Sequence, residues 1–178
     1  TGMSPTTTLD STVKVDTTTY GYTSVKGVSE TYLDMMGRTL AQGRGLTYVD
    51  IMDNKKVCVV GDYIARAAYG GDAIGQTIKI GSERFTIVGV LEANVSSTTD
   101  QEGTDDDMIF VPYTTAQRIS KTSASSYGVV LVSDELADEG KNLLVVGIES
   151  ILHAEDGYFI TSLSEMLETM TGMINMVV

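Results

Sequence analysis

The sequence predicts an α+β fold, because three segments carry strand and helix patterns. An apolar run over 57–60 is followed by an alanine-rich helical segment that ends at Gly70 and Gly71. Residues 74–92, IGQTIKIGSERFTIVGVLE, alternate apolar and polar side chains on both sides of a glycine, as the two strands of a hairpin do. Residues 126–163 carry a strand, a helix and a second strand pattern, which indicates a βαβ-like unit.

The composition restricts the function. Twenty-four acidic residues against twelve basic ones give a net charge of −12, so no nucleic-acid partner is expected. No run approaches the roughly 18 to 20 apolar residues of a membrane helix, and the first ten residues lack a signal-peptide layout, so the chain as given is expected to be soluble. The single cysteine, Cys58 in KVCVVG, is expected to be a buried thiol, and a disulfide framework is excluded.

The first third of the chain predicts short elements. TVKV (12–15) and YGYTSV (20–25) predict two strands around a polar turn. In GVSETYLDMMG, Ser29 is expected to cap a short helix that ends at Met36, with Gly37 in the left-handed position after it. LAQGRGLTYVD (40–50) is expected to be a loop.

In the middle third, Asp62 is expected to be the N-cap of the helix that follows strand Val57–Val60. The period of two then constrains the hairpin, because an even loop places both apolar pairs on one face. We expect a four-residue loop over 81–84, with Ile80 opposite Phe85 and Ile78 opposite Ile87.

Residues 93–107, ANVSSTTDQEGTDDD, contain five acidic residues and no base, which predicts a mobile, exposed loop. MIFVP then predicts a strand that ends at Pro112. In YTTAQRI, Thr114 and Gln117 have the spacing of a capping box at the start of a helix.

The last third predicts the strand YGVVLV, a helix over about 134–154, and the strand GYFITSL (157–163). The apolar stripe of that helix comprises Leu136, Leu143, Leu144, Ile148, Ile151 and Leu152. From Ser164 onward, Met166, Leu167, Met170, Met173, Ile174 and Val177 recur at helical spacing. This segment is either a core-facing helix or a stalk that pairs with a partner helix or runs into a bilayer. We favour the stalk, because the segment is apolar to its end and has no cap.

Three motifs suggest chemistry, and a plainer interpretation is favoured for each. GGDAIGQT (70–77) resembles a phosphate-binding loop, but Gln76 replaces the lysine, and the motif follows a helix and opens a strand, so turn glycines are favoured. The acidic side chains Asp100, Glu102, Asp105, Asp106 and Asp107 could supply calcium ligands, but they lack the EF-hand spacing, so a solvated loop is favoured. His153, the only histidine, forms no catalytic set unless carboxylates and Cys58 converge on it, so a capping or surface role is favoured.

Taken in order, three segments resemble a known family. GVSETYLDMMGRTLAQGRGLT, KVCVVGDYIARAAYGGDAIGQTIKIGSERFTIVGVLE and DDDMIFVPYTTAQR are similar to the extracytoplasmic (periplasmic core) domain of MacB-type ABC transporter permeases, which neighbour the FtsX-like permeases. The similarity covers about 3–163, and the block 57–92 together with IFVPYTTAQ is its most specific part.

The resemblance implies a two-lobed α+β domain between two transmembrane helices. A porter-like αβ lobe would comprise 1–23 and 120–163, a β-rich lobe would be inserted as 24–119, and 164–178 would be a membrane-proximal C-terminal helix. A hinge would lie near 22–26 and 118–126. The family usually has a strand and a helix ahead of the pair that is Ser4 and Pro5 here, so the first lobe is expected to be incomplete or paired differently.

The resemblance also implies a function by coupled motion and not by catalysis, with no cofactor or metal in this domain. An ATP-binding domain or subunit would drive export of peptides, macrolides or lipoproteins, in a permease homodimer, with a membrane-fusion adaptor protein. The domain would lie on the extracytoplasmic side of the cell membrane. The expected partner or coupling surfaces are the acidic loop, with Asp105, Asp106 and Asp107, and the terminal helix, with Met166, Met170 and Met173.

Two other classes remain open from the sequence. A surface binding or adhesion module would use the acidic loop as its contact site. A hydrolase would require His153 to meet carboxylates in a pocket.

Overall fold

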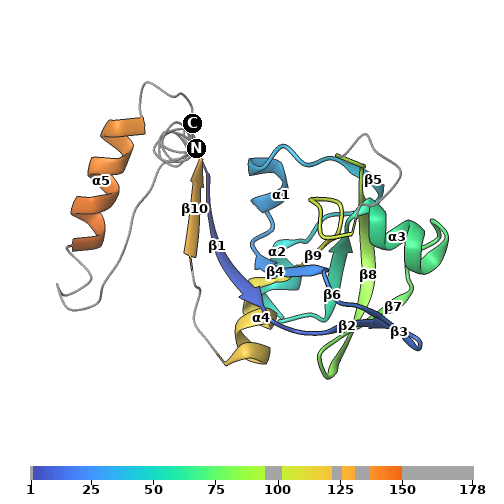
Figure 1. The fold of residues 1–178 in the computed structure, drawn as a ribbon. Helices are drawn as coiled ribbons and strands as arrows, with labels where there is room; N and C mark the ends of the chain where they lie inside the picture. Colours follow the sequence, from blue (N-terminus) through green and yellow to red (C-terminus); the bar gives the residue numbers. More distant parts are fainter. Residues whose placement is uncertain (1, 95–101, 122–125, 131–136, 150–178) are drawn as a thin grey trace, which may run out of the picture. The chain divides into compact units, whose positions relative to one another are not determined.

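The computed structural model describes residues 2–94, 102–121, 126–130 and 137–149. The chain divides into two compact units, one of residues 2–130 and one of residues 131–178 with residue 1. Helix α5 (Ala137–Glu149) is the described part of the second unit and lies within the helix predicted for 134–154 (Figure 1). In its apolar stripe Leu143 is exposed and Leu144 is half-buried. None of the helices in the described ranges is long and apolar enough to span a bilayer.

The described strands form one mixed sheet in the unit 2–130, in the order β10-β1-β4-β9-β6-β8-β7-β2-β3, with β5 added beside β8. Their bounds are β1 Gly2–Leu9, β2 Val13–Val15, β3 Thr18–Tyr20, β4 Ser24–Val28, β5 Leu40–Gly43, β6 Val57–Val60, β7 Thr77–Ile80, β8 Glu83–Leu91, β9 Met108–Pro112 and β10 Ser126–Val130. Only residues 10–12 separate β1 from β2, and this continuous segment pairs with β4 at one end and with β7 at the other. The sheet therefore closes on itself.

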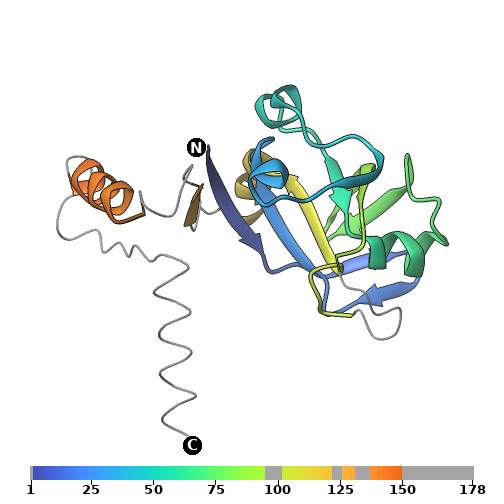
Figure 2. The same cartoon turned by 90° about the horizontal axis from the view of Figure 1, so that it is seen from above.

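Four helices accompany these strands: α1 Tyr32–Met35, α2 Tyr48–Met52, α3 Asp62–Tyr69 and α4 Tyr113–Ser120. Figures 1 and 2 show α3, in green, beside the curled strands. Ile64 and Ala65 of α3 pack into the larger apolar cluster, which also contains Ala116 of α4. The helices are few and short, so the sheet dominates this α/β unit.

The two central strands β6 and β9 are buried on both faces. Cys58 and Val60 belong to the larger apolar cluster, whereas Val59 belongs to a second cluster with Leu33 of α1. Alternate side chains of a strand point to opposite faces, so β6 separates the two clusters. This explains why the strand is a continuous apolar run and not an alternating one.

The hairpin has the predicted buried face but a different register. Ile78 and Ile80 of β7 and Phe85 and Ile87 of β8 are all buried in one cluster. Ile78 lies opposite Phe85, and Ile80 lies opposite Glu83, so Gly81 and Ser82 alone form the turn. The expected four-residue loop is therefore wrong, and the even loop length is right. An even number of turn residues fixes the face of the hairpin on which the apolar side chains lie, but it does not fix which residues lie opposite each other.

Three expected helix caps are wrong. The N-cap of α1 is Thr31, and that of α3 is Gly61. The N-cap of α4 is Pro112, whose side chain has no hydrogen-bonding group. The Thr114 hydroxyl, expected to cap this helix, donates to the Ile51 carbonyl instead. The left-handed residue expected after α1 is confirmed, with φ of 63° at Gly37, and α3 ends at Gly70, which is also left-handed with φ of 61°.

Helix α2 lies where a loop was expected. Its N-cap Thr47 accepts a hydrogen bond from the Asp50 N–H, and the Asp50 carboxylate accepts one from the Thr47 N–H. This is a capping box with Asp in place of the usual Glu or Gln. Asp50 is buried and also accepts from Arg44 at 2.6 Å, while Lys55 lies 3.6 Å away.

Strand β2, which the resemblance assigns to the first lobe, hydrogen-bonds to β3 and to β7 of the hairpin. Its pairing therefore joins segments that the resemblance assigns to different lobes. The lobe boundaries at 23, 120 and 163 stay a prediction. The expected strand 157–163 and the terminal helix from Ser164 lie outside the described residues.

Candidate functional site

Strand β1 joins two parts of the sheet and is the centre of the candidate site. Residues 2–6 pair with β10, and residues 7–9 pair with β4. The change of partner occurs between Thr6 and Thr7. Strand β1 therefore links β10 to β4, and we call residues 2–9 and 21–29 the strand junction.

Hydroxyl groups hold the outer half of β1 to the segment after β4. The buried Ser4 Oγ accepts from the Ser29 N–H at 3.1 Å and from the Ser29 Oγ at 2.8 Å. Ser4 Oγ in turn donates to the Pro5 carbonyl, and Ser29 Oγ lies 3.1 Å from Thr31 Oγ1. Ser29 thus ties β1 to the start of α1 and does not cap that helix.

The acidic loop returns to this junction through Asp107. The Asp107 carboxylate accepts from Thr23 Oγ1 at 2.6 Å and from the Gly103 N–H at 2.8 Å. Its carbonyl accepts from the Ser24 N–H at 3.1 Å. Asp107 is 1% exposed, so these hydrogen bonds satisfy a charge that would otherwise be buried alone. Residues 23 and 24 lie within the hinge expected near 22–26.

The neighbouring Asp106 closes the base of the same loop. Its carboxylate accepts from the Asn94 N–H at 2.8 and 3.1 Å and lies 3.3 Å from Arg38 Nη2. Asp106 is 0% exposed. Its carbonyl lies where a Cβ on Gly61 would be, so glycine is required at 61 for this close approach.

The exposure expected for the acidic loop is therefore wrong for two of the three aspartates. Asp106 and Asp107 are buried because each carboxylate accepts a side-chain hydrogen bond from a distant segment and a main-chain hydrogen bond from within the loop, whereas Asp105 is exposed. A role in partner contact stays a prediction for Asp105. The other three expected contact residues, Met166, Met170 and Met173, lie outside the described residues, as does His153.

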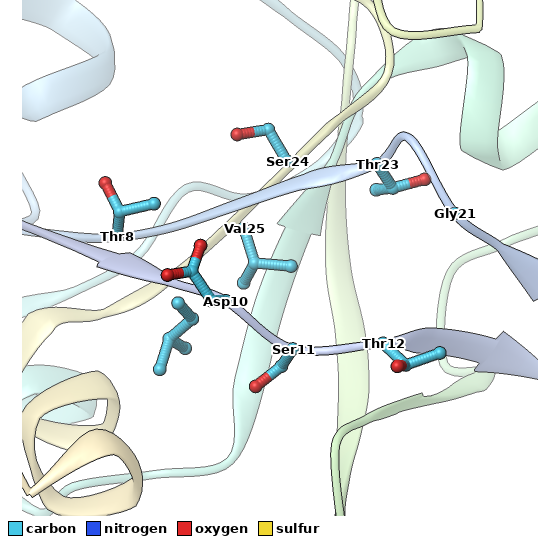
Figure 3. Close-up of a pocket in the computed structure, with 9 residues that line it drawn as sticks. Thr8, Asp10, Ser11, Thr12, Gly21, Thr23, Ser24 and Val25 are labelled. Atoms are coloured by element: carbon cyan, nitrogen blue, oxygen red, sulfur yellow. The ribbon is translucent and has the colours of Figure 1, made fainter.

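A polar pocket of about 340 Å³ opens where β1 and β4 cease to pair. Figure 3 shows the two segments side by side at Thr8 and diverging towards Thr12 and Gly21. Hydroxyl side chains and the Asp10 carboxylate line the pocket, and Asp10 projects from one segment towards the other. One carboxylate among hydroxyls gives a polar hollow at the junction, without a nucleophile beside a base among its lining residues.

The other sequence motifs are structural where the structure describes them. GGDAIGQT lies between α3 and β7, with φ of 96° at Gly71 and 80° at Gly75, so its glycines form turns. Within the described ranges, no three His, Cys, Asp or Glu side chains gather in a way that could hold a metal ion. Cys58 is buried, and burial raises the pKa of its thiol far above the usual range.

Sequence reasoning missed Thr23 and Arg38, the side chains that pair with the two buried aspartates. Thr23 is 84 residues from Asp107, and Arg38 is 68 residues from Asp106. No local pattern links such distant positions. The hydroxyl-rich composition around 4–12 and 23–31 is the only signal that sets the junction apart.

Comparison with known proteins identifies the family of this chain. The family model described as the MacB-like periplasmic core domain matches residues 1–144. The macrolide export ATP-binding/permease protein MacB of Chlorobium luteolum is 30% identical over 163 residues, which cover 86% of this chain and 24% of that protein. MacB 1/2 of Paracoccus denitrificans is 28% identical over 150 residues, which cover 83% of this chain and 22% of that protein. The chain thus spans about a quarter of the length of these relatives.

Solved structures show the same fold. The crystal structure of the periplasmic region of MacB from Actinobacillus actinomycetemcomitans matches with a TM-score of 0.73 at 20% identity, covering 96% of this chain and 76% of that one. The extracellular domain of the noncanonic ABC-type transporter YknZ from Gram-positive bacteria matches with a TM-score of 0.64 at 16% identity, covering 82% and 75%. The chain belongs to the MacB-like periplasmic core domain family, and it is the periplasmic core of a MacB-like ABC transporter permease.

Proposed function

We propose that this domain couples ATP hydrolysis on an ATP-binding domain or subunit to export by changing its shape at the strand junction. The observation that carries this proposal is the division of β1 between two partners, with 2–6 on β10 and 7–9 on β4. A strand shared in this way passes a displacement from one pairing to the other. The buried hydrogen bonds of Ser29 and Asp107 to the junction make that transmission stiff.

The finer architecture is part of the same proposal. A porter-like lobe of 1–23 and 120–163 moves against an inserted β-rich lobe of 24–119, and the helix 164–178 leads towards a transmembrane segment. The domain lies on the extracytoplasmic side of the membrane. Relatives named as macrolide export ATP-binding/permease proteins support export as the task. The exported compounds are peptides, macrolides or lipoproteins.

We also propose the partners. The full-length permease acts as a homodimer with a membrane-fusion adaptor protein, and the exposed Asp105 together with Met166, Met170 and Met173 contributes contact surface. The domain itself is non-catalytic and binds no cofactor. Neither the adhesion module nor the hydrolase is favoured, because the family assignment points to a permease.

A reversible lock at the junction tests the coupling. Ser4 Oγ and Ser29 Oγ are 2.8 Å apart, so Ser4→Cys with Ser29→Cys places two sulfur atoms within bonding reach. In the full-length permease, oxidation of this pair should abolish macrolide resistance in cells and uncouple ATP hydrolysis from drug stimulation, and a reductant should restore both. The buried Cys58 should not interfere.

A matched pair within the hairpin is the control. Thr77 and Thr86 lie directly opposite each other on β7 and β8, away from the junction. Oxidised Thr77→Cys with Thr86→Cys should leave export unchanged. Normal export by the oxidised Ser4–Ser29 variant would refute movement at the junction.

Separately, changing Met166, Met170 and Met173 to Ser should impair export if the terminal helix transmits motion.

A further inference from the structure

Three basic side chains form a row across the outer face of the sheet. Lys14 of β2 lies directly opposite Lys79 of β7, and Lys79 lies directly opposite Arg84 of β8. Directly opposed residues of antiparallel strands point to the same face, with their Cβ atoms about 5 Å apart. All three are exposed, whereas their strand neighbours Val13 and Ile78 are buried on the other face. We call Lys14, Lys79 and Arg84 the basic row.

None of the three bases of the basic row forms an ion pair among the described residues. The ion pairs of this part of the chain involve other bases. Asp16 and Asp72 share an open pocket with Arg84, yet neither forms an ion pair with it. Like charges placed directly opposite each other destabilise a sheet. In a chain with 24 acidic and 12 basic residues, this clustering of bases works against stability and is not a consequence of composition.

The shape of the row selects the kind of anion. Neighbouring strands are about 4.8 Å apart, so three strands set the cations along a line of about 10 Å. The main-chain groups at these positions pair within the strand ladders and do not point outwards to cradle one phosphate. Thr19 continues the line beyond Lys14. A flat line of cations suits an extended anion with several charges in sequence.

A protein segment fits better than a lipid surface. The exposed large apolar side chains of the described residues lie outside β2, β3, β7 and β8, so the row has no neighbouring group on these strands to insert into a bilayer. An acidic peptide segment meets the row locally, because charges beyond a Debye length of about 8 Å are screened at physiological salt.

We propose that the basic row is a docking surface for an acidic segment of a partner protein, held by carboxylate pairs with the two ammonium groups and the guanidinium group. This surface is independent of the coupling proposed for the strand junction. It lies on the strands β2, β7 and β8, and none of its residues belongs to the junction.

A labelled hexaglutamate peptide is the probe, and fluorescence anisotropy with the full 178-residue chain is the measurement. At physiological salt the peptide should bind, and Lys14→Gln, Lys79→Gln and Arg84→Gln together should weaken binding by about tenfold or more, as the loss of three exposed ion pairs implies. The control changes Lys26, Arg118 and Lys121 to Gln, which removes the same charges elsewhere, and should alter binding by less than about twofold.

A stability measurement separates docking from a structural role. Lys79→Glu alone places an acid between two bases, so the melting temperature should rise while peptide binding falls. Equal loss of binding in the two triple variants would overturn the proposal, as would peptide binding that Lys79→Glu leaves intact. Displacement of the peptide by millimolar inorganic phosphate would assign a phosphate site instead. Tighter binding through the row to phosphatidylglycerol vesicles than to the peptide would assign a membrane surface instead.

Discussion

Replacing Asp50 by Asn should destabilise the domain in a pH-dependent way. Asp50 is 1% exposed, and its carboxylate accepts from Arg44 at 2.6 Å and from Thr47 Oγ1 at 2.7 Å, with Lys55 at 3.6 Å. Burial alone would raise the pKa of this carboxyl, but the hydrogen bonds from Arg44 and Thr47 outweigh burial and lower its pKa from 3.8 to about 2.

The size of the effect follows from the difference between the two states. A pKa of 3.8 in the unfolded chain and about 2 in the folded chain corresponds to about 2 kcal/mol of folding free energy at neutral pH. Because the folded pKa is the lower one, this contribution is complete above about pH 4 and is lost as the pH falls towards 2. Asp50→Asn should therefore lower the free energy of unfolding by about 2 kcal/mol at pH 7 and by much less near pH 2.

Urea unfolding followed by circular dichroism at both pH values measures this difference. Asp53→Asn is the control. Asp53 is exposed, and its carboxylate lies 4.0 Å from the Lys55 ammonium, which is too far for a strong ion pair, so this change should have no measurable effect on stability. If Asp50→Asn is as stable as the wild type at pH 7, the cost of burying the Asp50 carboxylate cancels the free energy gained from its ion pairs. A deficit of the same size at pH 2 would show that the charge of Asp50 is not its source.

Three further predictions concern packing and the loop. Gly61→Ala should cost about 1–3 kcal/mol in urea unfolding, because its Cβ would overlap the Asp106 carbonyl, whereas Gly21→Ala, with open space around it, should be neutral. Thr23→Val and Asp107→Asn should each destabilise the domain, and a double-mutant cycle should give a coupling energy of about 1 kcal/mol or more, with simple additivity counting against the hydrogen bond. Cys58 should resist thiol reagents at pH 8 in the folded domain and react once urea unfolds it, because burial raises its pKa and blocks access; rapid labelling of folded protein would contradict this.

The hydrophobic periodicity of the sequence predicted the strand β6, the helix α3 and the buried face of the hairpin. The apolar run 57–60 and the helix after it were recognised because their period changes at Gly61. The hairpin face followed from alternation, while its register depended on a turn that alternation does not specify. Helix α2 was missed because it is five residues long and its capping box uses Asp50. A helix this short has too few residues for a periodic signal.

The candidate site was less predictable than the fold. An acidic segment without bases looks solvated, yet Asp106 and Asp107 are buried because Asn94, Arg38 and Thr23 supply donors. Arg38 and Thr23 come from distant segments and Asn94 from the other end of the same loop, and only the folded chain brings them to the two aspartates. The family resemblance predicted the family and a fold that mixes strands and helices, and it did not identify which aspartates serve the structure.

The closure of the sheet through β1 and β2 has a consequence for folding. The first strands of this chain must wait for partners made much later, since Val13 pairs with Ile80 and Gly2 pairs with Val130. Contacts of such long sequence separation form slowly. During synthesis the early strands present unpaired edges, which invite association with other chains. Delayed pairing of this segment would therefore make the nascent domain dependent on protection until β7 emerges.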